Sequence, residues 1–160
     1  MDDARRATAA DIPRILELAR ALRDELRGLR GGELWETRER RVDPSAEALR
    51  TLVERDGACV AVGTIDGVVV GYGTVEVDEL GDGTRLGVIG DLYVEPGARA
   101  VGVGECIAEH LLAHCRQAGC RGIDALALPG HRAAKNFFER AGFTARALVM
   151  HKDLRGGGTP

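Results

Sequence analysis

The sequence predicts a single domain of the α/β (α+β) class, in which a mixed, mostly antiparallel central sheet carries helices on both faces. Its 160 residues, 44% of them hydrophobic, suffice for one buried core without disulfides or metals. The hydrophobic period changes along the chain, which predicts the order helix, helix, three strands, helix, strand, helix, strand. We expect this domain to span residues 1–155 and the glycine-rich residues 156–160 to form a disordered tail.

Two helices are expected to open the chain. Thr8 is the expected cap of the first, whose apolar residues recur at three- and four-residue intervals to about Arg27. Asp43 as a cap, followed by Pro44 at the first helical position, predicts the second helix. Gly57 is expected to end it.

Three antiparallel strands are expected next. Residues 59–65 and 68–77 are β-rich runs on either side of Asp66-Gly67. An Asp-Gly pair between two such runs is the strongest short signal for a hairpin. A loop rich in Gly and Asp then leads into a further strand that ends at Val94.

The second half of the chain returns to alternating helices and strands. The apolar spacing predicts a helix over about 104–118 and a strand over 123–128. A Pro-Gly turn then leads into a short helix over 132–141, and a last strand is expected over roughly 145–152.

Charge and cysteine content exclude several classes of protein. The net charge is −3, from 25 acidic and 22 basic residues, and aromatic residues are few, so no nucleic-acid partner is expected. No apolar run approaches the roughly 18 residues of a membrane span, and the chain opens without a hydrophobic leader. No two of the four cysteines form a CxxC pair, so reduced thiols and a cytoplasmic location are expected.

Residues 92–104 are the segment with the clearest chemical signal, because they end a strand, form a loop and open a helix. The start of a helix presents unpaired N–H groups and the positive end of a dipole, which suits a pyrophosphate. Gly102 and Gly104 allow an anion close to the backbone, and Arg99 adds a permanent charge. The chain has no Gly-Lys-Ser/Thr triplet for a Walker loop, and Ile107 stands where a Rossmann fingerprint needs its third glycine.

The motif Arg99-x-x-Gly102-x-Gly104, after a Val-x-Pro strand end, resembles the acyl-CoA-binding motif of the GNAT N-acetyltransferases. A second segment, Ala134-x-x-Phe137-Phe138-x-x-x-Gly142-Phe143, is similar to the last helix of that family and its Gly-Phe entry into the final strand. The resemblance covers nearly the whole chain, since the order of elements is also that of the family. It implies a GNAT-like fold.

The resemblance implies acetyl-CoA as cosubstrate and no metal. In the family, the strand before the motif splays from its neighbour and pairs with the pantetheine arm; the matching residues are Leu92, Tyr93 and Val94. A backbone N–H in this stretch would polarise the thioester carbonyl and stabilise the oxyanion. The residues that would hold the pyrophosphate are Arg99, Ala100, Val101, Gly102, Val103, Gly104 and Glu105.

This sequence departs from the family at two positions. Family members often carry Asn where His131 stands and a Tyr general acid where Phe138 stands. Phe138 has no proton to give. Either another group or a water protonates the CoA thiolate, or the low pKa of the leaving thiol makes a general acid unnecessary. His131 can still donate to the pantetheine and shares a helix face with Phe138 and Lys135. Lys135 is a candidate contact of a CoA phosphate, or else a solvated surface lysine.

Direct transfer needs a base that takes a proton from the ammonium group of the acceptor. Asp91 is the first candidate, Glu76 the second and His131 the third. Each residue also has a purely structural interpretation. Asp91 can be a hydrogen-bonding residue at a strand end, Glu76 can lie on a solvated face, and His131 can cap a helix. Cys115 lies on an apolar helix face, where thiols are usually inert, which disfavours a route through a cysteine.

Residues Cys106, His110 and His114 have a spacing of four that can suit metal ligands. They lie beside the apolar stripe of their predicted helix, and no carboxylate joins them at that spacing. We therefore expect rim residues and no metal.

The acceptor is expected to meet the first helix, the loop after it and the hairpin. The polar and aromatic residues offered there are Glu33, Trp35, Glu36, Tyr72, Glu76 and Asp78, of which Glu33, Trp35, Tyr72 and Glu76 are the predicted acceptor contacts. Carboxylates beside an aromatic ring suit a cationic amine, and a solvated loop with one anchoring Trp is the alternative.

The function predicted is transfer of an acetyl group from acetyl-CoA to a primary amine of a small molecule, amino acid or peptide, by direct attack in a ternary complex. The alternative is a non-catalytic acyl-CoA-binding or sensing module of the same fold. Dimers are common in the family, so a homodimer is a further expectation, and the sequence does not identify its interface.

Overall fold

Five strands form one sheet in the order β1-β2-β3-β4-β5 in the computed structural model, which describes residues 1–156. Their bounds are β1 (Asp2–Arg6), β2 (Ala58–Ile65), β3 (Val68–Glu79), β4 (Arg85–Val94) and β5 (Gly122–Asp124). The first four are antiparallel to their neighbours, and β5 alone is parallel, to β4. The predicted mixed, mostly antiparallel sheet is confirmed.

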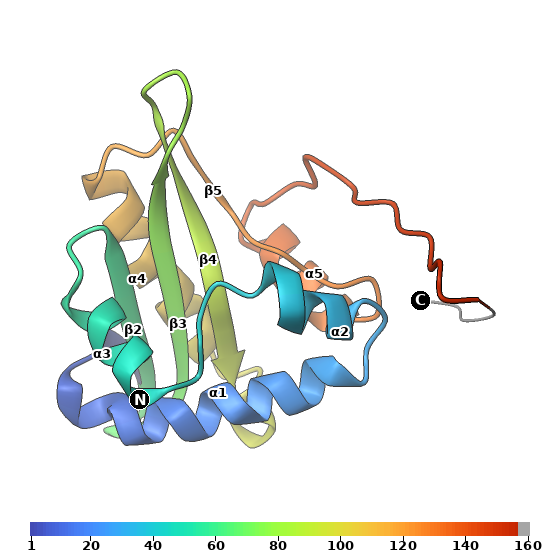
Figure 1. Ribbon diagram of the computed structural model, residues 1–160. Coiled ribbons are helices and arrows are strands. Elements are labelled where there is room, and N and C mark those ends of the chain that lie inside the picture. Colours follow the sequence, from blue (N-terminus) through green and yellow to red (C-terminus); the bar gives the residue numbers. More distant parts are fainter. Residues whose placement is uncertain (157–160) are drawn as a thin grey trace.

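Helices cover both faces of this sheet, as predicted. Their bounds are α1 (Ile12–Arg27), α2 (Gly32–Leu34), α3 (Ala46–Glu54), α4 (Val103–Gln117) and α5 (Arg132–Arg140), with short turns η1 (Ala9–Asp11), η2 (Trp35–Glu39) and η3 (Pro96–Ala98). Helices α1 and α3 lie on one face and α4 on the other, while α5 lies beside β5 at the edge (Figure 1). No helix within residues 1–156 is long and apolar enough to cross a membrane.

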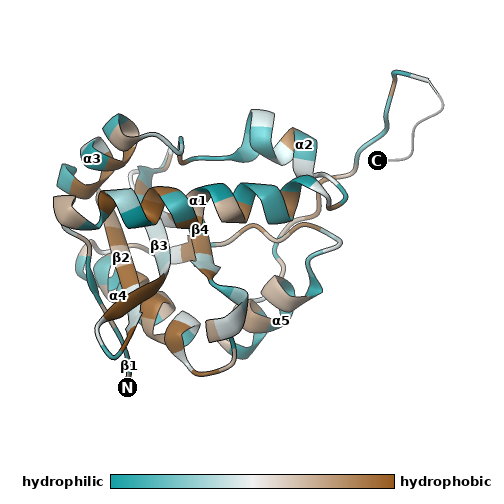
Figure 2. Ribbon diagram, turned by 90° about the horizontal axis from the view of Figure 1, so that it is seen from below, coloured by the Kyte–Doolittle hydropathy of each residue, from teal (hydrophilic) through white to brown (hydrophobic). Residues whose placement is uncertain are grey.

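The two faces of the sheet carry separate apolar cores. On one face, Leu18 and Leu22 of α1 and Leu49 of α3 pack with residues of β2 and β3. On the other face, Ile107 and Leu111 of α4 pack against the opposite side of the same strands. Figure 2 shows the apolar strands enclosed between α1 and α4. Because the sheet is covered twice, its central strands are buried on both faces.

Helix α4 approaches the sheet closely because β2 and β3 offer glycines there. A Cβ at Gly63 would lie 2.4 Å from Val103 Cγ1, and one at Gly73 would lie 2.6 Å from Ile107 Cγ2. Any side chain at these positions would push the helix that carries the candidate anion site away from the sheet.

Most helix boundaries agree with the prediction, with one shift. Asp11 accepts a hydrogen bond from the Thr8 N–H (2.8 Å), so Thr8 and Asp11 form the expected start of the α1 region. For α3 the cap is Ser45, whose Oγ accepts from the Ala48 N–H (3.2 Å), and not Asp43. The serine hydroxyl reaches the free amide of the first turn, so the helix begins two residues later than predicted.

Two strand predictions fail at the ends of the sheet. Strand β1 was not predicted: its charged sequence pairs along β2 and lies mostly exposed, so it shows no apolar alternation. The strand predicted over 145–152 is wrong, because residues 143–154 are extended without strand pairing. Strand β5 is also shorter than predicted. The tail expected at 156–160 falls, apart from Gly156, outside the described residues.

Candidate active site

The two parallel strands of the sheet pair briefly and then separate. Pairing between β4 and β5 runs from Leu86 with Gly122 to Val88 with Asp124, and stops. The rest of β4, residues 89–94, therefore has no strand on its β5 side. A cavity of about 60 Å³ lies at this separation, walled by α1, Trp35 of η2, β4, the residues after β5 and α5. Three predicted cofactor contacts, Leu92, Tyr93 and Val94, belong to this free stretch of β4.

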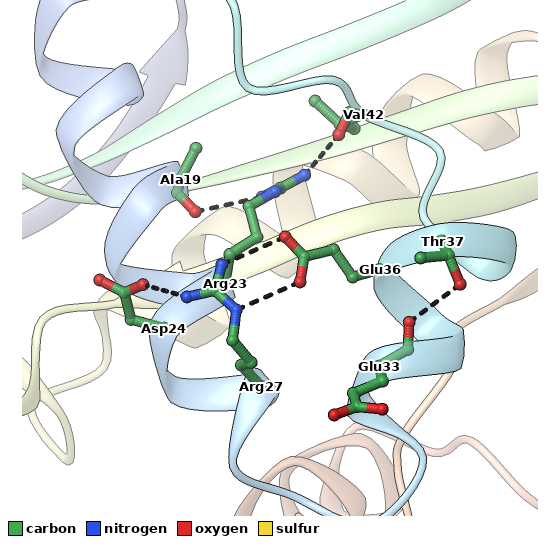
Figure 3. Close-up of polar contacts among 8 residues, drawn as sticks. All are labelled: Ala19, Arg23, Asp24, Arg27, Glu33, Glu36, Thr37 and Val42. Carbon is green, nitrogen blue, oxygen red and sulfur yellow. Dashed lines mark hydrogen bonds and ion pairs between the residues drawn. The ribbon is translucent and has the colours of Figure 1, made fainter.

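A buried carboxylate forms part of the cavity wall. The side chain of Asp91 is fully buried, and its Oδ2 accepts hydrogen bonds from the Tyr72 hydroxyl (2.6 Å) and from Arg23 Nη1 (3.0 Å). Arg23 also donates to the carbonyl oxygens of Ala19 (3.2 Å) and Val42 (Figure 3). These hydrogen bonds offset part of the cost of holding the two charges in the interior.

The other oxygen of this carboxylate is free. Within residues 1–156, Asp91 Oδ1 is one of three buried side-chain polar atoms without a hydrogen-bond partner; Arg23 Nε is another. Burial raises the pKa of Asp91 above the usual range of a carboxyl, although the Arg23 guanidinium and the Tyr72 hydroxyl oppose the rise. A raised pKa brings a carboxylate nearer to the range in which a general base works best.

Arg23 belongs to this site because of its place on α1. It follows Ala19 by one turn, on the face of the helix that is otherwise apolar and buried. Its guanidinium lies 5.5 Å from the centroid of the Trp35 ring. Trp35, itself buried, thus packs on the cation that holds Asp91.

The segment of α2 and η2 is tied to α1 by exposed polar contacts (Figure 3). Arg27 contacts Asp24 (3.0 Å) on its own helix and the Glu36 carboxylate (3.2 Å) across the gap. Glu33, a predicted acceptor contact, is exposed on α2, where its carbonyl oxygen accepts from Thr37 Oγ1 (3.0 Å). Trp35 is the residue of this segment that lines the cavity.

The first turn of α4 is an uncapped helix start. Gly102 occupies the N-cap position at φ +94°, and no side chain caps the helix. The following N–H groups, from Val103, Gly104 and Glu105, therefore lack the side-chain partner that a capping residue supplies. Ala100 in the same loop also has positive φ (+71°). The uncapped helix start that the sequence predicts is therefore present, and anion binding there stays a prediction.

Arg99, however, points toward α1 and away from those donors. Its two terminal nitrogens donate to the Glu25 carboxylate (3.1 and 2.7 Å), and its Nε donates to the carbonyl oxygen of Val94 (2.8 Å). A Cβ at Gly102 would lie 2.4 Å from an oxygen of Asp2. The carboxylates of Glu25 and Asp2 therefore border the candidate anion site, and Arg99 is already paired with Glu25.

Helix α5 supplies the second wall of the cavity. His131 lies at its N-cap position with Nε2 3.8 Å from Glu25 Oε1, and burial lowers the pKa of its imidazole, which favours the neutral ring at pH 7. Phe138 lines the cavity and packs against the rings of Phe137 (5.3 Å) and Phe143 (5.2 Å). Lys135 pairs with Glu139 (2.6 Å) in an exposed position.

Two predicted site residues lie away from the cavity. Glu76 pairs with Arg55 (2.8 Å) and Arg41 (3.6 Å) in a separate groove of about 410 Å³ beside α3. Tyr72 is fully buried behind Asp91 and does not line the cavity. The structure thus brings together Asp91, Trp35 and His131, but not Glu76.

Sequence reasoning missed Arg23 and Glu25. Arg23 had a visible signal, since it is a charged residue at an apolar position of the α1 period. Glu25 had none, because a glutamate on a helix surface is ordinary until the fold places Arg99 beside it.

The described cysteines and histidines do not form a reactive thiol site or a metal site. Cys59 and Cys115 are buried, and burial raises the pKa of Cys115 to about 12, which keeps its thiol protonated and unreactive. No group of three or more potential metal ligands gathers anywhere in the part of the chain that the structure describes.

The sequence matches the acetyltransferase (GNAT) family over residues 17–143. No curated protein matches it significantly. Among solved structures, the tetramutant of the BH1408 protein from Bacillus halodurans is 19% identical with a TM-score of 0.79, covering 94% of this chain and 99% of that one. Glucosamine-6-phosphate N-acetyltransferase from Arabidopsis thaliana is 21% identical with a TM-score of 0.66, covering 96% and 99%.

An aminoglycoside acetyltransferase from an uncultured soil metagenomic sample is 21% identical with a TM-score of 0.69, covering 95% of this chain and 94% of that one. At these identities the structures establish the fold alone. The family match spans most of the chain, including the splayed strand and the start of α4. The protein therefore belongs to the acetyltransferase (GNAT) family, whose members are acetyl-CoA-dependent N-acetyltransferases.

Proposed function

We propose that the protein moves the acetyl group of acetyl-CoA to a primary amine of a small molecule, amino acid or peptide, with Asp91 as general base. The observation that supports this most strongly is the hydrogen bonding of the Asp91 carboxylate. One oxygen is held by Arg23 and Tyr72, the other is buried and unpartnered, and Asp91 is one of the residues that line the cavity. A group held in this way is oriented in advance for proton transfer.

The residues of the site fit acetyl-CoA. The free edge of β4 at residues 92–94 offers backbone groups to the amides of the pantetheine, as an added strand would. Residues 99–105 offer uncapped N–H groups and one arginine to the pyrophosphate. When bound, acetyl-CoA supplies an activated acetyl thioester. A β4 N–H beside its carbonyl would stabilise the negative charge that develops during attack.

Proton transfer is assigned to the chain's own groups. The amine must lose a proton to attack, and we assign that proton to the unpartnered Asp91 Oδ1, which accepts it directly or through a water. A cavity of about 60 Å³ has room for a few waters, and a polar wall would retain them. Phe138 cannot protonate the thiolate, so that proton comes from water or from another group.

The acceptor is proposed as the amine end of a larger molecule. The cavity admits only a small group, and the rest of the acceptor would extend along the rim formed by α2 and η2. The Arg23 guanidinium already lies over the Trp35 ring, so Trp35 serves as a wall rather than as a cage for a second cation. Glu33, exposed on the rim, is the proposed contact for a positive charge on the acceptor.

Thiol release from acetyl-CoA with a panel of primary amines tests the proposal. We expect turnover above the blank with at least one amine. In the Asp91→Asn variant, kcat should fall by about 10²- to 10⁴-fold, because the proton acceptor is lost. The variant also leaves Arg23 without its buried charged partner, so circular dichroism and CoA affinity are measured to show that it is folded and still binds the cosubstrate. His131→Gln and Glu76→Gln test the other two candidate bases. A fall in kcat as large as that of Asp91→Asn in either variant would contradict Asp91 as the base. Tight CoA binding without turnover on any amine would instead indicate the non-catalytic, acyl-CoA-sensing module.

A further inference from the structure

The groove beside α3 is larger than the cavity at Asp91, and the proposed reaction does not use it. Its volume of about 410 Å³ falls within the range of sites for small molecules. We call it the α3 groove. Its lining includes Arg41, Val42, Ala48, Leu52, Arg55 and Glu76. Because charged and apolar residues share this lining, the groove suits a small molecule that carries both kinds of group.

Two arginines line the α3 groove with unused hydrogen-bond donors. Arg41 and Arg55 both approach the Glu76 carboxylate through Nη2, at 3.6 and 2.8 Å from Oε2. Arg41 Nη2 also donates to Asp78 Oδ1 (2.6 Å). Within residues 1–156, the Nε and Nη1 groups of these two arginines make no hydrogen bond. Since a guanidinium group with free N–H groups binds a carboxylate well, the arginines point to a ligand with a carboxylate.

Carboxylates line the same groove beside the arginines. The Glu76 side chain is 17% exposed, and no residue within 1–156 donates a hydrogen bond to its Oε1. Asp43 and Glu47, at the start of α3, add two more negative charges to the lining. A purely anionic ligand would be repelled by these carboxylates, and a purely cationic ligand would be repelled by the arginines. A zwitterion, with one charge of each sign, complements both sets.

The α3 groove also has an apolar part. Val42, Ala48 and Leu52 contribute to its lining, and Val42 and Leu52 are otherwise buried in the core below it. An apolar group of a ligand that covers them removes further apolar surface from water. Positive, negative and apolar groups thus occur together in one groove, and they match the carboxylate, the ammonium group and the side chain of an apolar α-amino acid.

The segment before α3 joins the groove to the candidate active site. Its Val42 lines the groove, and the Val42 carbonyl oxygen accepts a hydrogen bond from Arg23, which holds Asp91 (Figure 3). On β4, a Cβ at Gly90 would lie 2.9 Å from Val42 Cγ2, and Gly90 lines the cavity. Asp91 itself does not line the groove. A ligand in the groove would therefore contact the segment that supports the proposed base without reaching the base.

We propose that the α3 groove binds an α-amino acid with an apolar side chain, which acts as an effector and not as the acceptor of the acetyl group. Its carboxylate contacts Arg41 and Arg55, and its ammonium group contacts Glu76. Bound there, the amino acid holds the segment before α3 in the position in which the Val42 carbonyl accepts from Arg23. It thereby favours the state in which the proposed base is oriented.

Isothermal titration calorimetry on the protein without acetyl-CoA tests the site, so the result does not depend on the proposed reaction. The probes are L-leucine, L-methionine and L-phenylalanine, and we expect saturable binding of at least one of them to a single site. Arg55→Gln should weaken this binding by about 10- to 100-fold, the usual range for a charged hydrogen bond.

The matched control is Arg50→Gln, since Arg50 is exposed on α3 but does not line the groove. Its binding of the amino acid should be unchanged. The side chain of Arg55 is 48% exposed, so both variants should fold, which circular dichroism checks. Saturable binding of none of the three probes, or an equal loss in the two variants, would overturn the proposal.

Analogues that lack one charge test the need for a zwitterion. For L-leucine these are 4-methylpentanoate, without the amino group, and 3-methylbutylamine, without the carboxyl group; the corresponding pair is used for another probe that binds more tightly. Each analogue should bind at least about 10-fold more weakly than the amino acid, because it loses one charged contact. An analogue that binds as tightly as the amino acid would overturn the assignment.

The fluorescence of Trp35 tests the effector role. Trp35 is the only tryptophan of the chain, the Arg23 guanidinium lies 5.5 Å from the centroid of its ring, and it does not line the α3 groove. We expect its emission to change along the same saturation curve as the heat of binding, and to need correspondingly more amino acid in Arg55→Gln. An unchanged emission at saturation would overturn the effector role. A change at the same concentration in Arg55→Gln would place the amino acid in the cavity and overturn the site.

Discussion

Residues 1–117 and residues 118–156 differ in how they are held. The first region contains every buried residue, with one core on each face of the sheet. The second contains β5, α5 and the extended residues 143–154, and its apolar residues are exposed or half-buried. The cavity lies at the boundary, with Asp91 on the packed side and His131 and Phe138 on the other. The well-packed region orients the proposed base, while the second wall is formed by residues that are at best half-buried.

The ion pairs of the two regions show the same difference. In the packed region, the side chains of Arg23 and Asp91 are 3% and 0% exposed. In the second region, those of Arg146 and Asp124 are 68% and 24% exposed. A buried pair that loses one partner leaves an uncompensated charge, whereas an exposed pair exchanges its partner for water.

The largest effect is therefore expected at Arg23. Arg23→Met should lower the free energy of unfolding by about 3–5 kcal/mol, because it leaves the Asp91 carboxylate buried and unpaired. Arg146→Met, the matched change in the second region, should cost less than about 1 kcal/mol. Urea unfolding followed by circular dichroism measures both. Equal losses of unfolding free energy in the two variants would contradict the conclusion that the two regions differ in how much their ion pairs stabilise the fold.

The next effect concerns Arg99, which the packed region holds through Glu25. Arg99→Met should weaken acetyl-CoA binding by about 10- to 100-fold, the usual range for a charged hydrogen bond to phosphate. Glu25→Gln should tighten binding by up to about fivefold, since it removes a partly exposed competitor. Isothermal titration calorimetry measures both. Unchanged affinity in Glu25→Gln would show that the pair does not compete with the cosubstrate.

A smaller effect compares two glycines at the opposite ends of α4. Gly102 and Gly119 both have positive φ (+94° and +74°), so replacement by Ala should cost each about 1–2 kcal/mol of stability. Only Gly102→Ala should also weaken CoA binding, because its Cβ enters the anion site and meets Asp2. Binding and urea unfolding are measured on both variants. Equal affinity in the two would place the phosphate site elsewhere.

The smallest effect is expected on the pH profile. The Tyr72 hydrogen bond lowers the pKa of Asp91, so Tyr72→Phe should raise that pKa. The base acts when unprotonated, and activity is lost as the pH falls through this pKa. The acid limb of kcat/KM should therefore move to higher pH. Tyr93→Phe serves as the control, since Tyr93 lies against Arg99. An unmoved limb in Tyr72→Phe would argue against Asp91 as the base.

Sequence reasoning worked where a signal is local. The apolar period of α1 and α4 and the Asp-Gly turn between β2 and β3 depend on neighbouring residues only, and all three elements were confirmed. It failed where a strand exists by pairing. Strand β1 has a charged sequence and pairs, while residues 145–152 have a strand-like sequence and do not. A strand forms only when it pairs with another strand, and the local sequence does not show whether such a partner is available.

The candidate site divides in the same way. The sequence by itself predicted an anion loop at 99–105, and the structure shows the uncapped helix start on which that prediction depends. It also put Asp91 first among the candidate bases. Only the tertiary structure decided that Arg23 holds Asp91, that Glu25 holds Arg99 and that Glu76 lies in another groove. These pairings join residues far apart in the chain, so the fold that brings their side chains together had to be known first.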